Sequence, residues 1–384
     1  MSDILNPTVR ADTKTSSHCK LKFGDKIGGY QICDKLGSGR FSTVWSAKKD
    51  DDVVAVKVYR AGSSDRHYFD NEVKILNRIA EFSKNACGPN LITYRGAFAH
   101  VDVGVDLAPR IHPCVLFNIE GDSVSKLLRY CKRTYNCGLS LVVVKKIMRG
   151  TFAGLEYLHN CGIIHTDIKP SNLLMDRKIS NAEDDFKISI GDLGSSTYAD
   201  DIFSDHVGTT QYIAPELILE LPYSYPIDIW ASFAMCFELL TGDLLFDVYS
   251  ECGVSYGDDD GEDECCAVSY ATTSSDTEDS SGSEDSSEAE QTNYKHLLLI
   301  ETVIGPAPRL FADYAQLYYN RRGKMKNDPD LQHIGIFGLL MHNYNIDAET
   351  CELIEAFLLQ GLKYIPAERI TATSALEHPF LKEN

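Results

Sequence analysis

The pattern of apolar residues changes near residue 120, and this change constrains the fold of the 384-residue chain more than any other feature. Before it, short runs rich in β-branched residues predict strands at 30–36, 43–48, 53–59, 91–98 and 114–119, with one helically spaced stretch at 67–82. After it, helical spacing predicts helices at 123–135, 141–160, 226–241, 294–303, 308–318, 348–360 and 371–376, with short strands near 173–175 and 187–190. The sequence therefore predicts an α+β chain of two lobes: a β-rich small N-terminal lobe (about 23–120), a hinge at 118–120 and a mainly helical C-terminal lobe (about 121–381).

Two segments are too polar to build a core. Residues 1–22 are rich in Ser, Thr, Asp and Lys, and we predict a disordered tail. Residues 249–292 form low-complexity runs, and 14 acidic side chains with no Lys or Arg fall at 251–290. We predict a disordered acidic Ser/Thr-rich insertion there, because it cannot bury enough apolar surface to offset the entropy of ordering. It is either a passive surface loop or an acidic tether that is phosphorylated or binds polycations.

The charge balance excludes some classes of protein. Removing the 14 acidic charges of the insertion from the net charge of −19 leaves only −5 for the other 344 residues. A near-neutral body has no basic face for phosphates, so we predict no direct nucleic-acid binding, while a basic protein partner remains compatible. No apolar run is long enough to span a membrane, and none of the 12 cysteines lies in a C-x-x-C pair. We expect free thiols in a reducing compartment, the cytoplasm, with the nucleus as a second location.

A glycine-rich turn, a lysine and a glutamate come in order in the first lobe. Glycines at 37 and 39 let backbone amides approach phosphates closely, although such glycines are also ordinary turn residues. Lys57 follows an apolar strand, from which it could reach phosphates or simply point to solvent. Glu72, on the next predicted helix, could hold Lys57 in place or be a plain surface charge. The turn and its flanks comprise Leu36, Gly37, Ser38, Gly39, Arg40, Phe41, Ser42, Thr43 and Val44.

A more specific motif lies at 165–172, with the sequence HTDIKPSN. Asp167 can accept the proton of a substrate hydroxyl, and Lys169 can steady a phosphate. Asn172 can offer an amide oxygen to a divalent metal, and Asp192, which follows the predicted strand at 187–190, can offer a carboxylate. These residues predict phosphoryl-transfer chemistry.

The ordered set of motifs resembles the eukaryotic protein kinase superfamily over residues 30–381. Three further members complete this set of motifs, and we assign them structural roles: the segment 208–216 (GTTQYIAPE), Asp228 in the sequence DIW, and Arg369. Several segments resemble the SR-protein kinases, which phosphorylate serines of Arg/Ser-rich splicing proteins. These are FSTVW (41–45), IHTDIKP (164–170), DLG (192–194), DIWA (228–231), FELLTGD (237–243), HLLLI (296–300), NRRG (320–323), YIP (364–366) and HPFL (378–381).

The resemblance implies the two-lobed kinase fold, with ATP and Mg²⁺ as cofactors. It implies that the segment from Leu36 to Val44 covers ATP and that Lys57 pairs with Glu72. It makes Asp167 and Lys169 catalytic, with Asn172 and Asp192 on the metal. Glu216 should pair with Arg369, and Asp228 should brace the loop at 165–172. Phe117 would back the adenine pocket, with the backbone around Ile119 holding adenine. The implied partners are basic, Arg/Ser-rich proteins, and we expect a monomer.

Departures from the family pattern leave alternatives open. Most kinases have Arg, which binds an activation-loop phosphate, where Thr166 stands, so we predict activity without that phosphorylation. SR-protein kinases have acidic docking residues where this chain has Lys295, and Glu301 is displaced by one position, whereas Asp243 is present. At Ile213 the sequence follows the pattern of protein kinases in general rather than that of the SR-protein kinases. The alternatives are a Ser/Thr kinase with another substrate, and a pseudokinase adaptor that holds basic partners.

Overall fold

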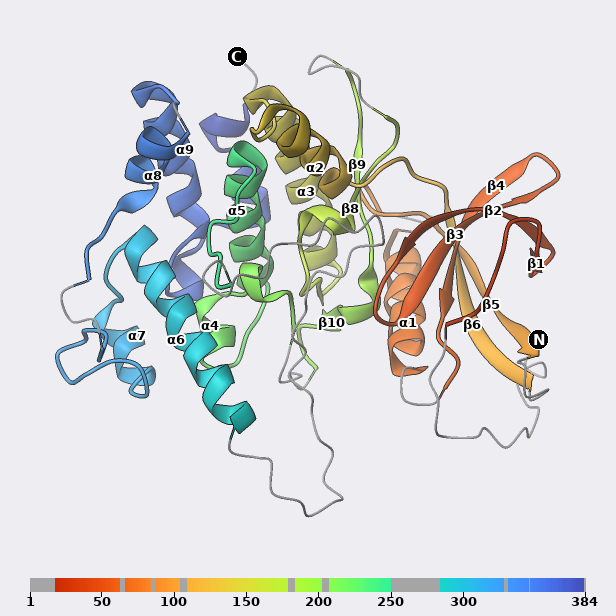
Figure 1. Ribbon diagram of the computed structural model, residues 1–384, viewed down its shortest axis with the longest axis horizontal. Helices are drawn as coiled ribbons and strands as arrows, with labels where there is room; N and C mark the ends of the chain where they lie inside the picture. The colour runs from red at the N-terminus through yellow and green to blue at the C-terminus, as the bar shows by residue number, and fades with distance from the viewer. Residues whose placement is uncertain are drawn as a thin grey trace. The chain divides into compact units, whose positions relative to one another are not determined.

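The computed structural model describes residues 18–62, 66–83, 88–103, 109–178, 184–201, 207–249, 284–327, 331–344 and 346–382. They form two compact units, one built from residues up to 120 and one from residue 121 onward, with 89–91 belonging to the second. The first unit is mainly sheet and the second mainly helix (Figure 1). The predicted α+β class is confirmed.

The first unit is a six-stranded antiparallel sheet in the order β1-β2-β3-β4-β6-β5. Its hairpin between β3 and β4 turns at residues 50–51, where Asp50 adopts a left-handed φ of 55°. One helix, α1 (Arg66–Ser83), packs beside β6. The strands are β1 (Lys26–Ile27), β2 (Tyr30–Ser38), β3 (Ser42–Lys49), β4 (Asp52–Tyr59), β5 (Tyr94–Val103) and β6 (Pro109–Asn118).

The segment just before β1 corrects the predicted boundary of the N-terminal tail. Cys19, placed in the tail at 1–22, is only 8% exposed and joins a core cluster with Ile27 and Ile32, while Leu21 packs against that cluster. Two apolar residues in a polar stretch are too weak a pattern to show in composition, yet burying them is favourable. Residues 1–17 of the predicted tail lie outside the described residues.

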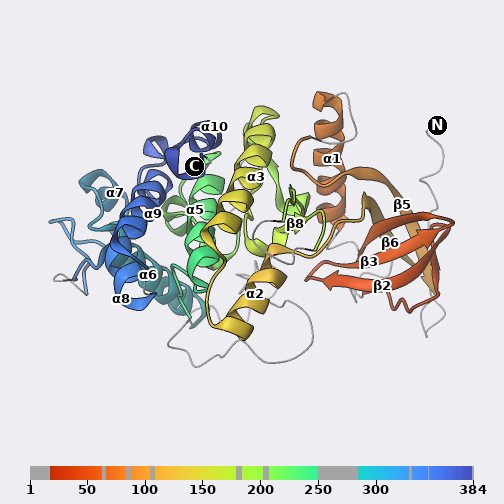
Figure 2. The ribbon, with the colours of Figure 1, turned by 90° about the horizontal axis from the view of Figure 1, so that it is seen from above.

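The second unit is built on helices that pack around α5 (Pro226–Thr241). Helix α5 is apolar on nearly every side because α3 (Leu141–Asn160) and α9 (Ala348–Gly361) flank it, as Figure 2 shows. The approach of α9 is close: a Cβ added to Gly361 would lie 1.9 Å from the Phe233 ring. The other helices are α2 (Val124–Tyr135), α4 (Pro215–Ile218), α6 (Glu284–Ile304), α7 (Arg309–Tyr314), α8 (Gly335–Asn343) and α10 (Ala372–Leu376).

Short strands of the second unit hold its loops. β7 (Ile163–Ile164) pairs with β10 (Thr197–Tyr198), and β8 (Leu173–Met175) pairs with β9 (Ile188–Ile190), both antiparallel. Because Leu173 lies opposite Ile190, the residue before β8 and the residues after β9 come to the same end of this hairpin. That end carries the polar residues of the motifs at 165–172 and 192–194.

The acidic insertion is shorter than the predicted 249–292. At the C-terminal end of that range, helix α6 begins at Glu284. At its N-terminal end, Tyr249 still belongs to the folded chain, because its backbone N–H donates to Asp247 Oδ1 at 3.2 Å. Helix-favouring Glu, Ala and Gln residues extend α6 beyond its apolar half, which an argument from charge alone overlooks. Residues 250–283, the rest of the insertion, lie outside the described residues.

Several other element predictions differ from the structure. Strand β6 begins at Pro109 rather than at 114, and β5 ends at Val103 rather than at 98. Strand β5 begins at Tyr94 rather than at 91, and α7 ends at Tyr314 rather than at 318. Helix α8 was not predicted, because its two glycines and short apolar run show no clear period. Within the described ranges, no helix combines the length and the apolar character needed to cross a membrane.

Candidate active site

Gly37 and Gly39, in the turn between β2 and β3, have no steric or conformational reason to be glycine. A Cβ added to Gly37 or to Gly39 would meet no atom within 4 Å, and neither residue adopts a positive φ. Gly39 N–H donates to Ser42 O at 2.9 Å, which closes the turn between β2 and β3. Open space above both positions is what close approach of a phosphate to the backbone requires, so this turn fits a nucleotide.

The structure forms the predicted ion pair of Lys57 and Glu72. Lys57, on β4, places its Nζ 2.8 Å from Glu72 Oε1 on α1, and their side chains are 10% and 0% exposed. The Tyr59 hydroxyl donates to the other oxygen of Glu72. With both carboxylate oxygens engaged, the glutamate is rigid, and the position of the lysine ammonium is fixed with it.

The other residues predicted to hold the nucleotide have varied surroundings. The Phe41 ring stacks on Tyr68 of α1 with ring centroids 3.8 Å apart, and its neighbour Arg40 lies over the Phe41 ring. Ser42 and Thr43 are buried in β3, and Phe117 is buried beside Tyr94. Of the rest, Leu36 and Ile119 are exposed, while Ser38 and Val44 are half-buried. Their predicted roles toward ATP stay predictions.

His165 fixes the start of the loop at 165–172 in the second unit. Its Nε2 lies 2.9 Å from Gly191 O, and a carbonyl can only accept, so the ring proton is on Nε2. Nδ1 is therefore the acceptor for the Asp167 N–H at 3.2 Å. The buried imidazole thus links the backbone of the loop to the residue before Asp192.

Asp228, at the start of α5, braces the same loop as predicted. Its two oxygens accept the backbone N–H groups of His165 and Thr166, each at 2.8 Å, and one of them also contacts His159 Nε2 at 2.9 Å. Thr166 has a left-handed φ of 73°, which costs a β-branched residue about 1–3 kcal/mol. The carboxylate holds this strained peptide and so directs Asp167.

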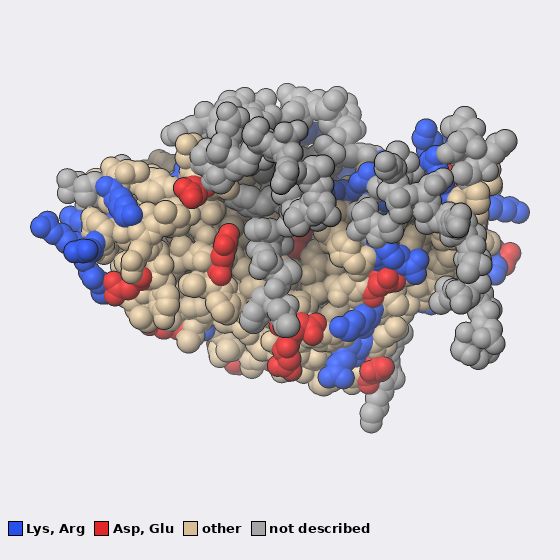
Figure 3. Space-filling view, turned by 90° about the horizontal axis from the view of Figure 1, so that it is seen from below, with Lys and Arg blue, Asp and Glu red and all other residues tan. Residues whose placement is uncertain are grey.

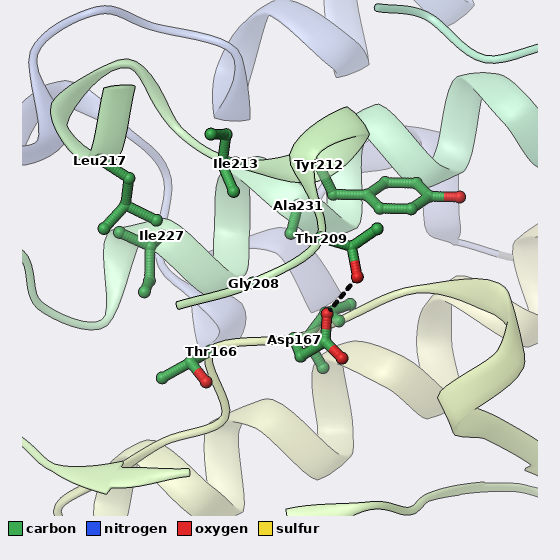
Figure 4. Close-up of a pocket in the computed structure, with 10 residues that line it drawn as sticks. Thr166, Asp167, Gly208, Thr209, Tyr212, Ile213, Leu217, Ile227 and Ala231 are labelled. Carbon is green, nitrogen blue, oxygen red and sulfur yellow. Dashed lines mark hydrogen bonds between the residues drawn. The ribbon is translucent and has the colours of Figure 1, made fainter. Parts of the chain in front are cut away.

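Asp167, Lys169 and Thr209 form a closed triangle, and Figure 4 shows its side between Asp167 and Thr209. Lys169 Nζ lies 2.9 Å from Asp167 Oδ2 and donates to Thr209 Oγ1 at 2.8 Å. The Thr209 hydroxyl in turn donates to Asp167 Oδ1 at 2.7 Å. The Asp167 side chain remains 15% exposed, so a carboxylate oriented by an ammonium and a hydroxyl is accessible to a substrate hydroxyl.

Sequence reasoning missed Thr209 as a site residue. We assigned the whole segment 208–216 a structural role, because a threonine in a loop has no distinctive spacing. Its contact with Asp167 joins residues 42 positions apart, and only the tertiary fold brings them together. Gly208 makes the approach possible: it has a φ of 87°, and a Cβ there would lie 3.0 Å from Thr166 O.

Asn172 and Asp192 lie at the same end of the β8–β9 hairpin and fit a divalent cation. Asn172 Nδ2 donates to Asp167 O at 2.8 Å and to Asp167 Oδ2 at 3.3 Å, which leaves its amide oxygen for a metal. Gly191 N–H donates to Asn172 O at 2.8 Å, which fixes the spacing of the two positions. Asp192 adopts a left-handed conformation, and an amide with a carboxylate is the oxygen donor set that Mg²⁺ prefers.

Comparison with known proteins now assigns the fold. The protein kinase domain family matches residues 30–381. The chain belongs to this family. A crystal structure described as a kinase domain superposes with a TM-score of 0.68 at 22% identity, covering 95% of this chain and 99% of that one. The two-lobed kinase fold predicted from the sequence is confirmed.

Similar kinases carry informative names. The serine/threonine-protein kinase SRPK of Physarum polycephalum is 28% identical over 97% of this chain and 90% of its own length. The serine/threonine-protein kinase AFC1 of Arabidopsis thaliana is 27% identical over 98% of this chain and 75% of its own. SRSF protein kinase 3 of Mus musculus is 32% identical, but over 56% of this chain and 32% of its own.

The kinase has a pocket beside Asp167 that is lined mainly by apolar side chains. Its walls come from the segment at 208–217 and from the start of α5, and Figure 4 shows these side chains around Thr209. Tyr212 belongs to the wall, and its hydroxyl donates to Glu238 Oε2 at 2.6 Å. The lining residues include Thr166, Ile213, Leu217, Ile227 and Ala231.

Glu238 makes the stability of the helical unit depend on pH. Burial raises the pKa of this carboxyl to about 7, against the Tyr212 hydrogen bond, which lowers it. Since the folded pKa exceeds the unfolded one, the stabilisation is complete below pH ~4.5 and disappears as the pH rises through 7. We expect the unfolding free energy of wild type to fall by roughly 3 kcal/mol relative to Glu238→Gln between pH 4.5 and 8. Urea titrations of both proteins at several pH values measure this difference, and a difference that does not change with pH contradicts the assignment.

The acidic docking residues expected from SR-protein kinases are mostly engaged or buried. Asp243 Oδ1 lies 2.9 Å from Lys132 Nζ, and its Oδ2 accepts the Tyr344 hydroxyl at 3.2 Å. Glu301 is only 9% exposed, and burial raises the pKa of its carboxyl. The helical unit therefore presents fewer free carboxylates at these positions than the resemblance implies.

The surface of the kinase mixes acidic and basic side chains, as one face shows in Figure 3. Exposed basic residues cluster near α7, where the 319–325 hairpin is folded: Tyr319 bridges Met325, which is fully buried. The basic residues of this region are Arg309, Arg321, Arg322, Lys324 and Lys326. Because they lie on α7 and on this folded hairpin, they do not form a free basic tail.

Proposed function

We propose that this kinase transfers the γ-phosphoryl group of ATP to serine in Arg/Ser-rich proteins. The Asp167–Lys169–Thr209 triangle is the observation that carries the transfer, and the names of the SRPK and SRSF protein kinase relatives support the substrate class. Phosphoryl transfer needs little covalent chemistry from the protein, so positioning and charge supply most of the rate.

The residues divide the work as follows. Asp167 accepts the hydrogen bond of the substrate hydroxyl and takes its proton as the phosphorus–oxygen bond forms. Lys169 neutralises charge beside that hydroxyl, and Lys57, held by Glu72, is suited to the phosphates of the nucleotide. Mg²⁺, when bound through Asn172 and Asp192, neutralises charge on the phosphates.

A kinase with another serine substrate is the second candidate. Glu301 is buried and Asp243 already has two partners, so these carboxylates are not free for an Arg-rich peptide. The near-neutral folded body also gives only weak electrostatic attraction, unless the acidic insertion supplies it.

Labelled-phosphate transfer to two peptides separates these candidates. One peptide contains Arg-Ser repeats, and the other is a generic basic peptide with one serine. We expect kcat/KM at least about tenfold higher for the Arg-Ser peptide, with attraction weakening as salt rises. Equal kcat/KM for the two keeps the kinase and rejects the Arg-Ser assignment.

We further propose activity without activation-loop phosphorylation. Thr166 stands where most kinases have the phosphate-binding Arg, and its hydroxyl donates to Ser195 O at 3.0 Å. A neutral hydrogen bond thus takes the place of an ion pair with a phosphate. Treating the purified kinase with a phosphatase should leave kcat within about twofold, since no cation at this position awaits a phosphate. A loss of most activity, restored by rephosphorylation, contradicts this.

A further inference from the structure

Three potential metal ligands meet in the sheet of the first unit, far along the chain from one another. Cys19 precedes β1, Asp102 lies near the end of β5, and His112 lies on β6. The thiol sulfur, a carboxylate oxygen and a ring nitrogen all lie within 4.8 Å of one another. None of the three has a role in phosphoryl transfer.

His112 has a lone pair that no group among the described residues uses. The side chain is fully buried, and its Nδ1 lies 2.9 Å from Tyr59 O. Because the carbonyl can only accept, Nδ1 carries the proton, and Nε2 of the neutral ring is an acceptor. Nε2 is buried and has no hydrogen-bond partner among the described residues. A buried orphan acceptor is costly, so it needs an explanation.

Metal-binding histidines have this arrangement. One ring nitrogen donates to a backbone carbonyl or carboxylate, which fixes the tautomer and turns the other nitrogen toward the ion. Tyr59 O does this for His112. The strand register explains why Asp102 is nearby. His100 of β5 lies directly opposite His112 of β6, so these two side chains share a face of the sheet. Asp102 is two residues beyond His100 on β5, so it lies on that same face.

Ordinary packing explains only part of the cluster. Cys19 could be a buried thiol in the core cluster, where it lies with Ile27 and Ile32. Asp102 lies directly opposite Arg110 of β6, which offers the carboxylate a nearby cation. Packing and charge thus account for the sulfur and the carboxylate one by one, but they leave the orphan nitrogen of His112 unexplained.

We propose that Cys19, Asp102 and His112 bind a Zn²⁺ ion, with water in the fourth position. One thiolate, one imidazole and one carboxylate form a mixed N/S/O set that suits zinc rather than Mg²⁺ or Ca²⁺. Zinc bonds of about 2.0–2.3 Å bring tetrahedral ligand atoms to about 3.3–3.8 Å from one another, so a small side-chain adjustment from the present spacing completes the site.

The ion would have a structural role in the first unit. It would add a metal tie between the segment before β1 and strands β5 and β6, which already share a core cluster through Cys19 and Cys114. It would also hold, through His112, the carbonyl of Tyr59, whose hydroxyl contacts Glu72. Zinc would thereby stabilise the surroundings of the Lys57–Glu72 pair without contacting a substrate.

Metal content tests the proposal directly. The full chain is incubated with excess Zn²⁺, freed of unbound metal and analysed by mass spectrometry of the elements. We expect about one zinc per chain in wild type and in two controls, Cys33→Ser in the same sheet and Asp70→Asn on the exposed face of α1. Cys19→Ser and Asp102→Asn should bind zinc at least about 100-fold more weakly. Circular dichroism shows whether each variant is folded.

Cobalt titration of the wild type keeps the proposal testable even if a variant does not fold. Co²⁺ bound through a thiolate produces a sulfur-to-metal charge-transfer band, which Zn²⁺ should abolish by competition. Wild type without bound zinc and without this band overturns the proposal. So does a folded Cys19→Ser variant that retains zinc as wild type does. Neither outcome affects the proposed phosphoryl transfer, which uses none of the three ligands.

Discussion

Replacing Asp167 by Asn should lower kcat for peptide phosphorylation by about 10²–10⁴-fold, the range that a positioned general base supplies. The amide keeps the size of the side chain and can still accept the Thr209 hydroxyl, but it cannot take the substrate proton. It also loses the charge that pairs with Lys169 at 2.9 Å. The affinity for ATP should stay within a few fold of the wild-type value, because Asp167 acts on the substrate hydroxyl that receives the phosphoryl group rather than on the nucleotide. Single-turnover kinetics with labelled ATP measures the change.

The matched control for this substitution is Asp185→Asn. Asp185 is an exposed carboxylate of the same unit, outside the loop at 165–172. Its replacement should leave kcat within about twofold, because surface substitutions away from special features have small effects. A kcat of Asp167→Asn within tenfold of wild type would remove Asp167 from the catalytic role.

Replacing Arg369 by Ala should destabilise the kinase by about 3–5 kcal/mol. Arg369 donates to both oxygens of Glu216 at 2.6 Å, and the two side chains are 0% and 4% exposed. The guanidinium also donates to Lys363 O and stacks over Trp230. Truncation leaves the Glu216 carboxylate buried without its cation, and that desolvated charge accounts for most of the cost. Chemical denaturation measures the loss.

A double-mutant cycle separates this pair from its surroundings. Glu216→Ala combined with Arg369→Ala should cost less than the sum of the two single changes, because removing both charges leaves neither unpaired. Arg322→Ala, an exposed arginine near α7, is the control and should change stability by less than about 0.5 kcal/mol. Additive single changes would show that the ion pair is not the source of the loss.

The order of the elements could be predicted from the sequence, because each is a local pattern. Strands β3 and β4 alternate or run apolar, and α3 and α5 carry long apolar periods, so their bounds agree with the prediction within about two residues. The polar segment before β1 is predicted wrongly, because Cys19 is buried, and Leu21 partly buried, by strands that come later in the chain. Helix α8 has too short a pattern to be recognised.

The site residues likewise fall into two groups: those that lie in one local motif and those that only the tertiary fold brings together. Asp167, Lys169 and Asn172 share one short motif, so their proximity follows from eight consecutive residues. Thr209 and the His112 cluster depend on contacts between distant segments, and single residues of these types carry no spacing that marks them. Likewise, the sequence contains Asp243 and Glu301, but only the fold shows that one is paired and the other buried.

Transfer of labelled γ-phosphoryl from ATP-Mg²⁺ to serine is the measurement that tests the central claim most directly. The full chain is given an Arg-Ser peptide after ATP binding has been verified, and the phosphorylated amino acid is identified. We predict label on serine, at a turnover on the order of 1–100 per second for wild type. ATP bound without any transfer, to this peptide or to a generic basic one, would contradict the account and point instead to a protein that holds basic partners.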